Sequence, residues 1–164
     1  GAFKLSWPLI VVDFEATALS TDGYPIEVGI AMATSARSPI ETWSTLIKPD
    51  SCWLIDDQWD PDAERVHKIS RWSLRHGLPP AEALRELNSR VPSGAAVWCD
   101  GGYYDAAWLA TLAQAADCEP AFELRDLIQA ISTDFQLQGV FAKHAAVMRH
   151  PIERGRTRGE YWMP

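Results

Sequence analysis

The stretch VVDFEATAL, residues 11–19, joins an apolar run to two acidic residues that stand two positions apart. The residues before it are apolar and β-branched, which predicts a buried strand over PLIVVDF. Asp and Glu are depleted in strands, and burying unpaired carboxylates costs free energy. Asp13 and Glu15 are therefore candidates for chemistry at the end of this strand, with a solvated surface turn as the alternative.

The spacing of these two acids favours a cation between them. Alternate residues of an extended segment share a face, so Asp13 and Glu15 are expected to point to the same side. Two carboxylates held together repel each other unless a cation lies between them. Mg²⁺ or Mn²⁺ is the natural partner of such oxygen ligands. On this pair alone, a metal site and a surface turn are about equally favoured.

A third acid follows a second short apolar strand, AAVWCD. Asp105 opens the helix predicted after this strand, and ligand sites of open α/β sheets gather near the carboxyl ends of strands. Asp105 is therefore a candidate metal ligand, with a favourable charge at a helix N-terminus as the alternative. Asp100, which precedes Gly101 and Gly102, is interpreted as a turn residue.

The pattern along the 164 residues predicts one α/β domain. Three strands in quick succession, PLIVVDF, YPIEVGIAMA and ETWSTLIKP, predict an antiparallel meander. The stretch from Asp50 to Pro61 is predicted to be a loop, and its Trp-rich part, residues 51–60, is expected to be a lid, a dimer contact or core. Helices are expected over PDAERVHKIS, PPAEALRELNSRV, YYDAAWLATLAQAA and FAKHAAVMRH. In YYDAAWLATLAQAA, one stripe contains Tyr104, Trp108, Leu112 and Ala115. The segment AFELRDLIQAI is either a strand running into a helix or one helix.

Composition excludes some classes of function. A net charge of −7 argues against a protein that coats nucleic acid through a broad basic face. It leaves room for an enzyme that grips one strand end through bound metal ions. No apolar run approaches the ~20 residues of a membrane span, and no signal peptide is evident. Cys52, Cys99 and Cys118 lack metal-site spacing and are expected to be free thiols in a reducing cytoplasm.

Several segments together resemble one family. VVDFEATAL is similar to the first motif of the DEDD 3′→5′ exonucleases, the family of polymerase proofreading domains, whose pattern is Asp-x-Glu-[Ala/Thr]-Thr-Gly-Leu. VWCDGGYYDAAWLATL resembles the second motif, with Asp105 as its acid and Tyr104 in the aromatic place. The resemblance covers roughly residues 8–150 of the single domain 1–164, with 151–164 as a C-terminal tail. The first motif is matched at Asp13, Glu15, Ala16, Thr17 and Leu19, with Ala18 where Gly is usual.

This resemblance implies a ribonuclease H-like fold, with a central mixed five-stranded sheet flanked by helices. It implies removal of nucleotides from the 3′ end of single-stranded RNA or DNA with two Mg²⁺ or Mn²⁺ ions, about 3.5–4 Å apart in such sites. Asp13 would bridge both metals, Glu15 would bind the metal that activates water, and Asp105 would hold the second metal. The positions that line the terminal nucleotide would be Ala16, Leu19 and Tyr104, although Leu19 is equally well interpreted as a core residue.

The third motif departs from the family pattern, His-x-Ala-x-x-Asp-Ala. The chain has HAAVMRH, in which His144 would be the general base and Arg149 stands at the fourth acid. Three alternatives stay open: Glu153, or the more distant Glu160, supplies the missing carboxylate; the site works weakly with three acids; or the protein is inactive and binds nucleic-acid ends. The oligomeric state is also open, with a homodimer as one alternative.

Overall fold

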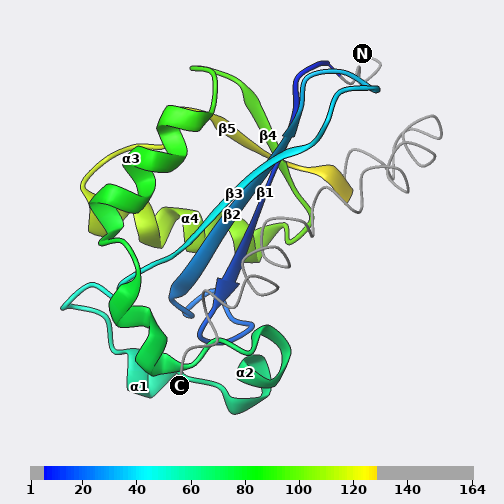
Figure 1. Cartoon of the computed structure of the whole chain (residues 1–164). Coiled ribbons are helices and arrows are strands. Elements are labelled where there is room, and N and C mark those ends of the chain that lie inside the picture. The colour runs from blue at the N-terminus through cyan, green and yellow to red at the C-terminus, as the bar shows by residue number, and fades with distance from the viewer. Residues whose placement is uncertain (1–5, 129–164) are drawn as a thin grey trace.

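The computed structural model describes residues 6–128, and residues 1–5 and 129–164 lie outside the described part. It contains a five-stranded sheet in the order β3-β2-β1-β4-β5 (Figure 1). The predicted α/β class with a five-stranded sheet is therefore confirmed. In chain order the elements are β1 (Leu9–Ala16), β2 (Pro25–Ala33), β3 (Glu41–Leu46), α1 (Ile55–Gln58), α2 (Pro61–His67), the 3-10 helix η1 (Arg71–His76), α3 (Pro80–Arg90), β4 (Ala96–Cys99), α4 (Tyr103–Ala116) and β5 (Glu123–Asp126).

The sheet is mixed, as predicted. β1 pairs with β2, and β2 with β3, in antiparallel register, which forms the expected meander. β4 lies beside β1 in parallel, with Val11 opposite Trp98, and β5 is parallel to β4. The carboxyl ends of β1, β4 and β5 therefore meet at one edge of the sheet, where ligand sites of open α/β sheets gather.

The main hydrophobic core lies between the sheet and two helices, α3 and α4, which cover one face (Figure 1). Ile10, Val12 and Phe14 of β1 belong to this core because alternate residues of a strand share a face. Asp13 and Glu15 therefore belong to the other face of β1. The helices contribute Ala83, Leu84 and Leu87 from α3 and Trp108, Leu109, Leu112 and Ala116 from α4.

The Trp-rich loop, residues 51–60, packs against the rest of the chain. The stretch from Asp50 to Pro61 was predicted to be a loop throughout, but it contains the one-turn helix α1, which is too short to leave a period in the sequence. Trp53 stacks on Tyr24 with ring centroids 5.2 Å apart, and Trp59 packs edge-on against His67 at 5.8 Å. These contacts favour the core alternative for this segment.

Two helices differ in detail from their predictions. α2 ends at His67 rather than at Ser70, because Lys68 adopts a left-handed backbone with φ 59° and Ser70 instead caps η1 through a hydrogen bond from the Ser73 N–H. The buried face of α4 differs from the predicted apolar stripe, since Trp108 is buried whereas Tyr104 is 37% exposed.

The remaining predictions have mixed outcomes. Of the two options for AFELRDLIQAI, the strand is correct, since β5 occupies Glu123–Asp126. Cys52, Cys99 and Cys118 are free thiols, as expected. Within residues 6–128, no helix combines the length and the apolar character that crossing a membrane requires. The helix predicted over FAKHAAVMRH lies outside the described residues.

Candidate metal centre

Three carboxylates converge at the carboxyl edge of the sheet. Asp13, Asp100 and Asp105 each place one oxygen within 4.8 Å of the others. We call this group the carboxylate cluster. The register explains it, since Asp13 and Asp100 each lie two residues beyond the parallel pair Val11 and Trp98. Because β4 ends at Cys99 while β1 continues to Ala16, the Asp13 carboxylate lies beside the open end of β4.

The turn before α4 fixes the third carboxylate. Gly102 has φ +54°, a left-handed conformation that favours glycine. A Cβ atom on Gly101 would collide with the Asp105 carboxylate. The Gly101 N–H instead donates a hydrogen bond to Oδ2 of Asp105 at 2.9 Å. The pair of glycines therefore lets the backbone approach Asp105 closely and orient it.

Burial and mutual repulsion disfavour the ionised forms of these acids. Burial, followed by the charges of Asp105, Glu15 and Asp100, raises the pKa of Asp13 from 3.8 to about 8. Burial also raises the pKa of Asp105 to about 7, with Asp100 and Glu15 adding to the rise and the hydrogen bond from Gly101 opposing it. Without a cation, the folded protein therefore keeps protons on carboxyl groups that ordinarily ionise near pH 4.

The donor set fits a divalent cation. Within residues 6–128, no Lys or Arg forms an ion pair with Asp13, Asp100 or Asp105. Three carboxylate oxygens at this spacing are the hard ligands that Mg²⁺ and Mn²⁺ prefer. A cation among them would offset the burial and the repulsion that together raise the pKa of Asp13.

The sequence prediction identified two members of the cluster and missed the third. Asp13 and Asp105 meet as expected. Asp100 was interpreted as a turn residue, but its carboxylate joins them. The missed signal is that Asp100 directly follows the apolar run AAVWC, just as Asp13 directly follows the apolar run LIVV. Glu15 is not one of the three, although its charge helps to raise the pKa of Asp13 and of Asp105.

The residues predicted to line the terminal nucleotide occupy different environments. Ala16 is buried in the main core. Leu19 is 71% exposed, so its interpretation as a core residue is wrong. Tyr104 stacks on Trp108, with ring centroids 5.7 Å apart. His144, Arg149, Glu153 and Glu160 lie outside the described residues.

The loop that carries Leu19 is fixed beside the start of α4. The Trp108 indole N–H donates a hydrogen bond to the Ser20 carbonyl at 2.9 Å. Thr17, at the beginning of the loop, is fully buried, and its Oγ1 accepts from the Tyr24 N–H at 3.0 Å. These bonds bring the exposed Leu19 loop and the half-exposed Tyr104 ring to the same end of α4.

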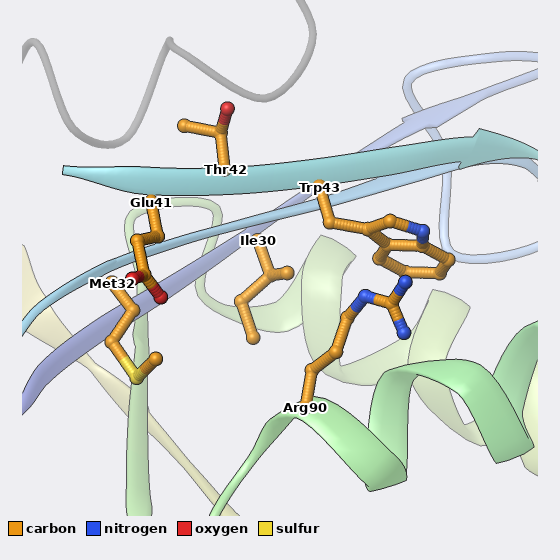
Figure 2. Close-up of a pocket in the computed structure, with 6 residues that line it drawn as sticks. All are labelled: Ile30, Met32, Glu41, Thr42, Trp43 and Arg90. Atoms are coloured by element: carbon orange, nitrogen blue, oxygen red, sulfur yellow. The ribbon is translucent and has the colours of Figure 1, made fainter.

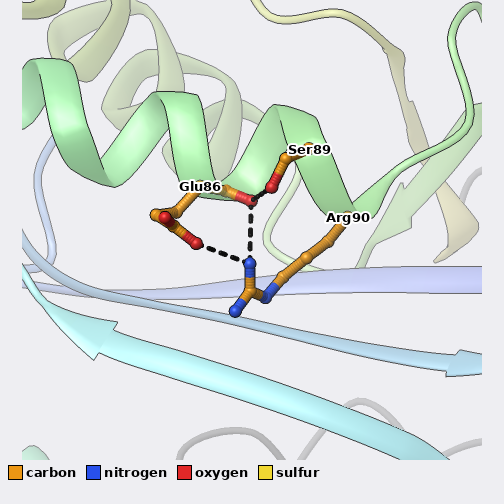
Figure 3. A network of polar contacts seen from close by, with 3 residues as sticks. All are labelled: Glu86, Ser89 and Arg90. Carbon is orange, nitrogen blue, oxygen red and sulfur yellow. Dashed lines mark hydrogen bonds and ion pairs between the residues drawn. The ribbon is translucent and has the colours of Figure 1, made fainter.

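A hollow lies away from the three acids, between the sheet and the end of α3. It measures about 280 Å³ and is lined by Ile30, Met32, Glu41, Thr42, Trp43 and Arg90 (Figure 2). We call it the Trp43 hollow. The Arg90 guanidinium lies 4.4 Å from the centre of the Trp43 ring. Its Nη1 also donates to Oε2 of Glu86 at 2.7 Å, and the Glu86 carbonyl accepts from both Arg90 and Ser89 (Figure 3). The positive charge of Arg90 at this hollow is therefore already met by neighbouring side chains.

Comparison of the chain with protein-family models and with curated proteins found no match.

Proposed function

We propose that this chain is a metal-dependent 3′→5′ exonuclease with a ribonuclease H-like fold, which removes nucleotides from the 3′ end of single-stranded RNA or DNA. The observation that carries the proposal is the convergence of Asp13, Asp100 and Asp105 within 4.8 Å. Asp13 and Asp105, the acids of the two motifs that resemble the DEDD exonucleases, come from distant parts of the chain. Their meeting at one edge of the sheet supports a shared cation site.

The fold part of the proposal rests on the strand order. An antiparallel β1-β2-β3 meander continues into parallel β4 and β5 across β1. Helices α3 and α4 cover one face of that sheet. This arrangement supports the ribonuclease H-like expectation, because it places both acidic motifs at the same edge.

The acids of the cluster would hold the metal ions. Asp105 would be a buried ligand and Asp13 a partly buried one, and the exposed Asp100 would be a third ligand at the mouth of the site. Asp100 would thereby compensate for the acid that Arg149 replaces in the third motif. Bound divalent ions would stabilise charge on the attacking and leaving oxygens of the phosphodiester.

The surroundings of the cluster would position the strand end. Leu19, on the loop fixed by Trp108, and the outer part of the Tyr104 ring would lie against the terminal base. His144 remains the proposed general base on the strength of the motif alone, since it lies outside the described residues.

A catalytically inactive protein that binds nucleic-acid ends is the second candidate. The observation that favours it is Arg149 at the position of the fourth acid. A fixed positive charge close to the metals would weaken their binding. An active enzyme should gain metal affinity and turnover from Arg149→Asp if that residue faces the site.

The experiment that tests the proposal is a time course with 5′-labelled single-stranded RNA and DNA in Mg²⁺ and in Mn²⁺. We expect a ladder that shortens from the 3′ end, faster in Mn²⁺ than in Mg²⁺, and no products with chelator. A 3′ phosphate should slow the reaction, whereas a 5′ phosphate should not.

Two results would overturn the enzyme assignment. Cleavage of a circular strand would show an endonuclease. Strand binding without products, and indifferent to chelator, would favour the binding protein instead.

A further inference from the structure

We infer that Tyr103 is a stacking platform for one nucleobase of a single strand, next to the carboxylate cluster. The inference rests on the proposed function, because it assigns the substrate contact of the same site. Tyr103 is the first residue of α4 and directly follows the Gly101-Gly102 turn that orients Asp105.

The exposure of Tyr103 is the first observation. Its side chain is 86% exposed, the largest fraction among the exposed large hydrophobic side chains of residues 6–128. The neighbouring Tyr104 ring is stacked on Trp108 and is only partly accessible. Tyr103 therefore offers the aromatic surface at the start of α4 that remains open to a ligand.

The space around Tyr103 is the second observation. Tyr103 borders a hollow of about 630 Å³, on the side of Leu124 and Arg125, and another of about 480 Å³, on the side of Asp100 and Gly101. Gly102, Asp126 and Ile128 border both hollows. Because Asp100 belongs to the carboxylate cluster, the smaller hollow beside the ring borders the proposed metal site.

The charges that line these hollows decide which part of a nucleotide fits. On the side of Asp100, the proposed cation of the carboxylate cluster would attract a phosphate group, whereas a neutral base has no such attraction and can occupy the space beside the ring. Ile128, which is 45% exposed, adds an apolar surface near the ring. Arg125 lies at the border of the larger hollow, with its guanidinium exposed beside Glu123. Because Arg125 is already paired with Glu123, the strand would place a base on Tyr103 and the adjacent phosphate beside the carboxylate cluster.

Two properties of a single strand suit it to this surface. Every base presents an aromatic face, so stacking on Tyr103 would hold a strand without regard to its sequence. A cation bound by Asp13, Asp100 and Asp105 would attract the adjacent phosphate and so draw the base towards the ring.

The test is a double-mutant cycle between the ring and a base. Eight-nucleotide single-stranded RNA and DNA, labelled with fluorescein at the 5′ end, are bound to the full chain in Ca²⁺, and Kd is measured by anisotropy. An abasic residue is then moved through the last five positions. At one position it should weaken binding by wild type about tenfold, the lower part of the range for base stacking on aromatic side chains. The same abasic residue should have no effect on Tyr103→Ala.

Tyr103→Phe and Trp72→Ala are the controls. Tyr103→Phe keeps the stacking surface and should bind as wild type does. Trp72 is an aromatic residue of η1, 48% exposed and in contact with Arg75, so Trp72→Ala should keep the full abasic effect. Absence of coupling to Tyr103 at all five positions, or no binding of either strand, would overturn the inference.

If protein rather than a nucleobase covers the Tyr103 ring, the measurements give a different result. If Tyr103→Ala melts below wild type and shows no coupling, the ring is covered by protein, either residues 129–164 or a second copy, and the inference is wrong. The product ladder reports separately on the proposed function. If Tyr103 couples to a base but no nucleotides are released, the inference about Tyr103 holds and the exonuclease assignment is wrong.

Discussion

In the carboxylate cluster, three acids lie within 4.8 Å of one another without an ion-pair partner among residues 6–128. In the Trp43 hollow, by contrast, the charge of Arg90 is met by the Glu86 carboxylate and by the Trp43 ring. In the first region the pKa of Asp13 rises to about 8, whereas in the second the charge of Arg90 is balanced by its neighbours. Acids that repel one another are typical of a functional site, whereas a charged side chain with an ion-pair partner is typical of structural packing.

The largest expected effect is that of Asp13→Asn, which removes one charge from the carboxylate cluster while keeping its shape. If the cluster holds the proposed metal ions, nucleotide release should fall about 1,000-fold or more, because a proposed metal ligand is lost. Initial rates on a labelled single strand in Mn²⁺ provide the measurement. Asp117→Asn changes an exposed acid after α4 and should keep the wild-type rate. If Asp13→Asn retained the wild-type rate, the cluster would not be the active site.

The next effect is the pH dependence of stability without metal. Asp13 and Asp105 have a raised pKa in the folded protein, so between about pH 4 and pH 8 the folded state binds more protons than the unfolded state. Their stabilising contribution is therefore present below pH 4 and is lost as the pH rises to 8. We expect the free energy of unfolding to fall by several kcal/mol, and Tm by about 10 °C or more, across this range.

Thermal melts with and without Mn²⁺ check this prediction. Saturating Mn²⁺ should restore most of the lost stability at pH 8, since it binds the ionised carboxylates of the folded state. Asp13→Asn should melt above wild type at pH 8 without metal and should gain less from Mn²⁺. A wild-type Tm without metal that did not fall between pH 5 and pH 8 would contradict the raised pKa values.

A smaller effect is expected for Asp100→Asn. Asp100 is exposed and its charge adds to the repulsion, so Asp100→Asn should not lower Tm without metal but should weaken Mn²⁺ binding about tenfold, since one of the proposed ligands is lost. Calorimetric titration, with Asp117→Asn as the control, measures the affinity. If Asp100→Asn bound Mn²⁺ with wild-type affinity, Asp100 would be a turn residue and not a metal ligand.

The smallest effect tests the other region. Arg90→Ala loses a partly exposed ion pair and the contact with Trp43, and we expect a destabilisation of about 1 kcal/mol, or about 2–4 °C in Tm. Arg85→Ala removes an exposed charge from the same helix and should change Tm less. Both variants should bind Mn²⁺ and release nucleotides as wild type does. A loss of activity in Arg90→Ala alone would show that the Trp43 hollow takes part in function.

The sheet was predictable because its strands are apolar runs bounded by turn residues, and four of the five were recognised from the sequence without ambiguity. The one-turn helix α1 was not, because four residues leave no period. Asp13 and Asp105 were predictable from motif spacing. Asp100 also follows an apolar strand, but its approach to Asp13 depends on the parallel register of Val11 and Trp98, which is set by packing rather than by local sequence.

The measurement that tests the central claim most directly is the number of protons released when Mn²⁺ binds. Calorimetric titrations in two buffers of different ionisation enthalpy give this number. With the pKa of Asp13 at about 8 and that of Asp105 at about 7, binding at pH 7 should release about one proton or more, and binding at pH 9 almost none. Asp13→Asn should lose most of this release. Mn²⁺ binding without proton release at pH 7, or with the same release in Asp13→Asn, would contradict a metal site built on the buried carboxylates.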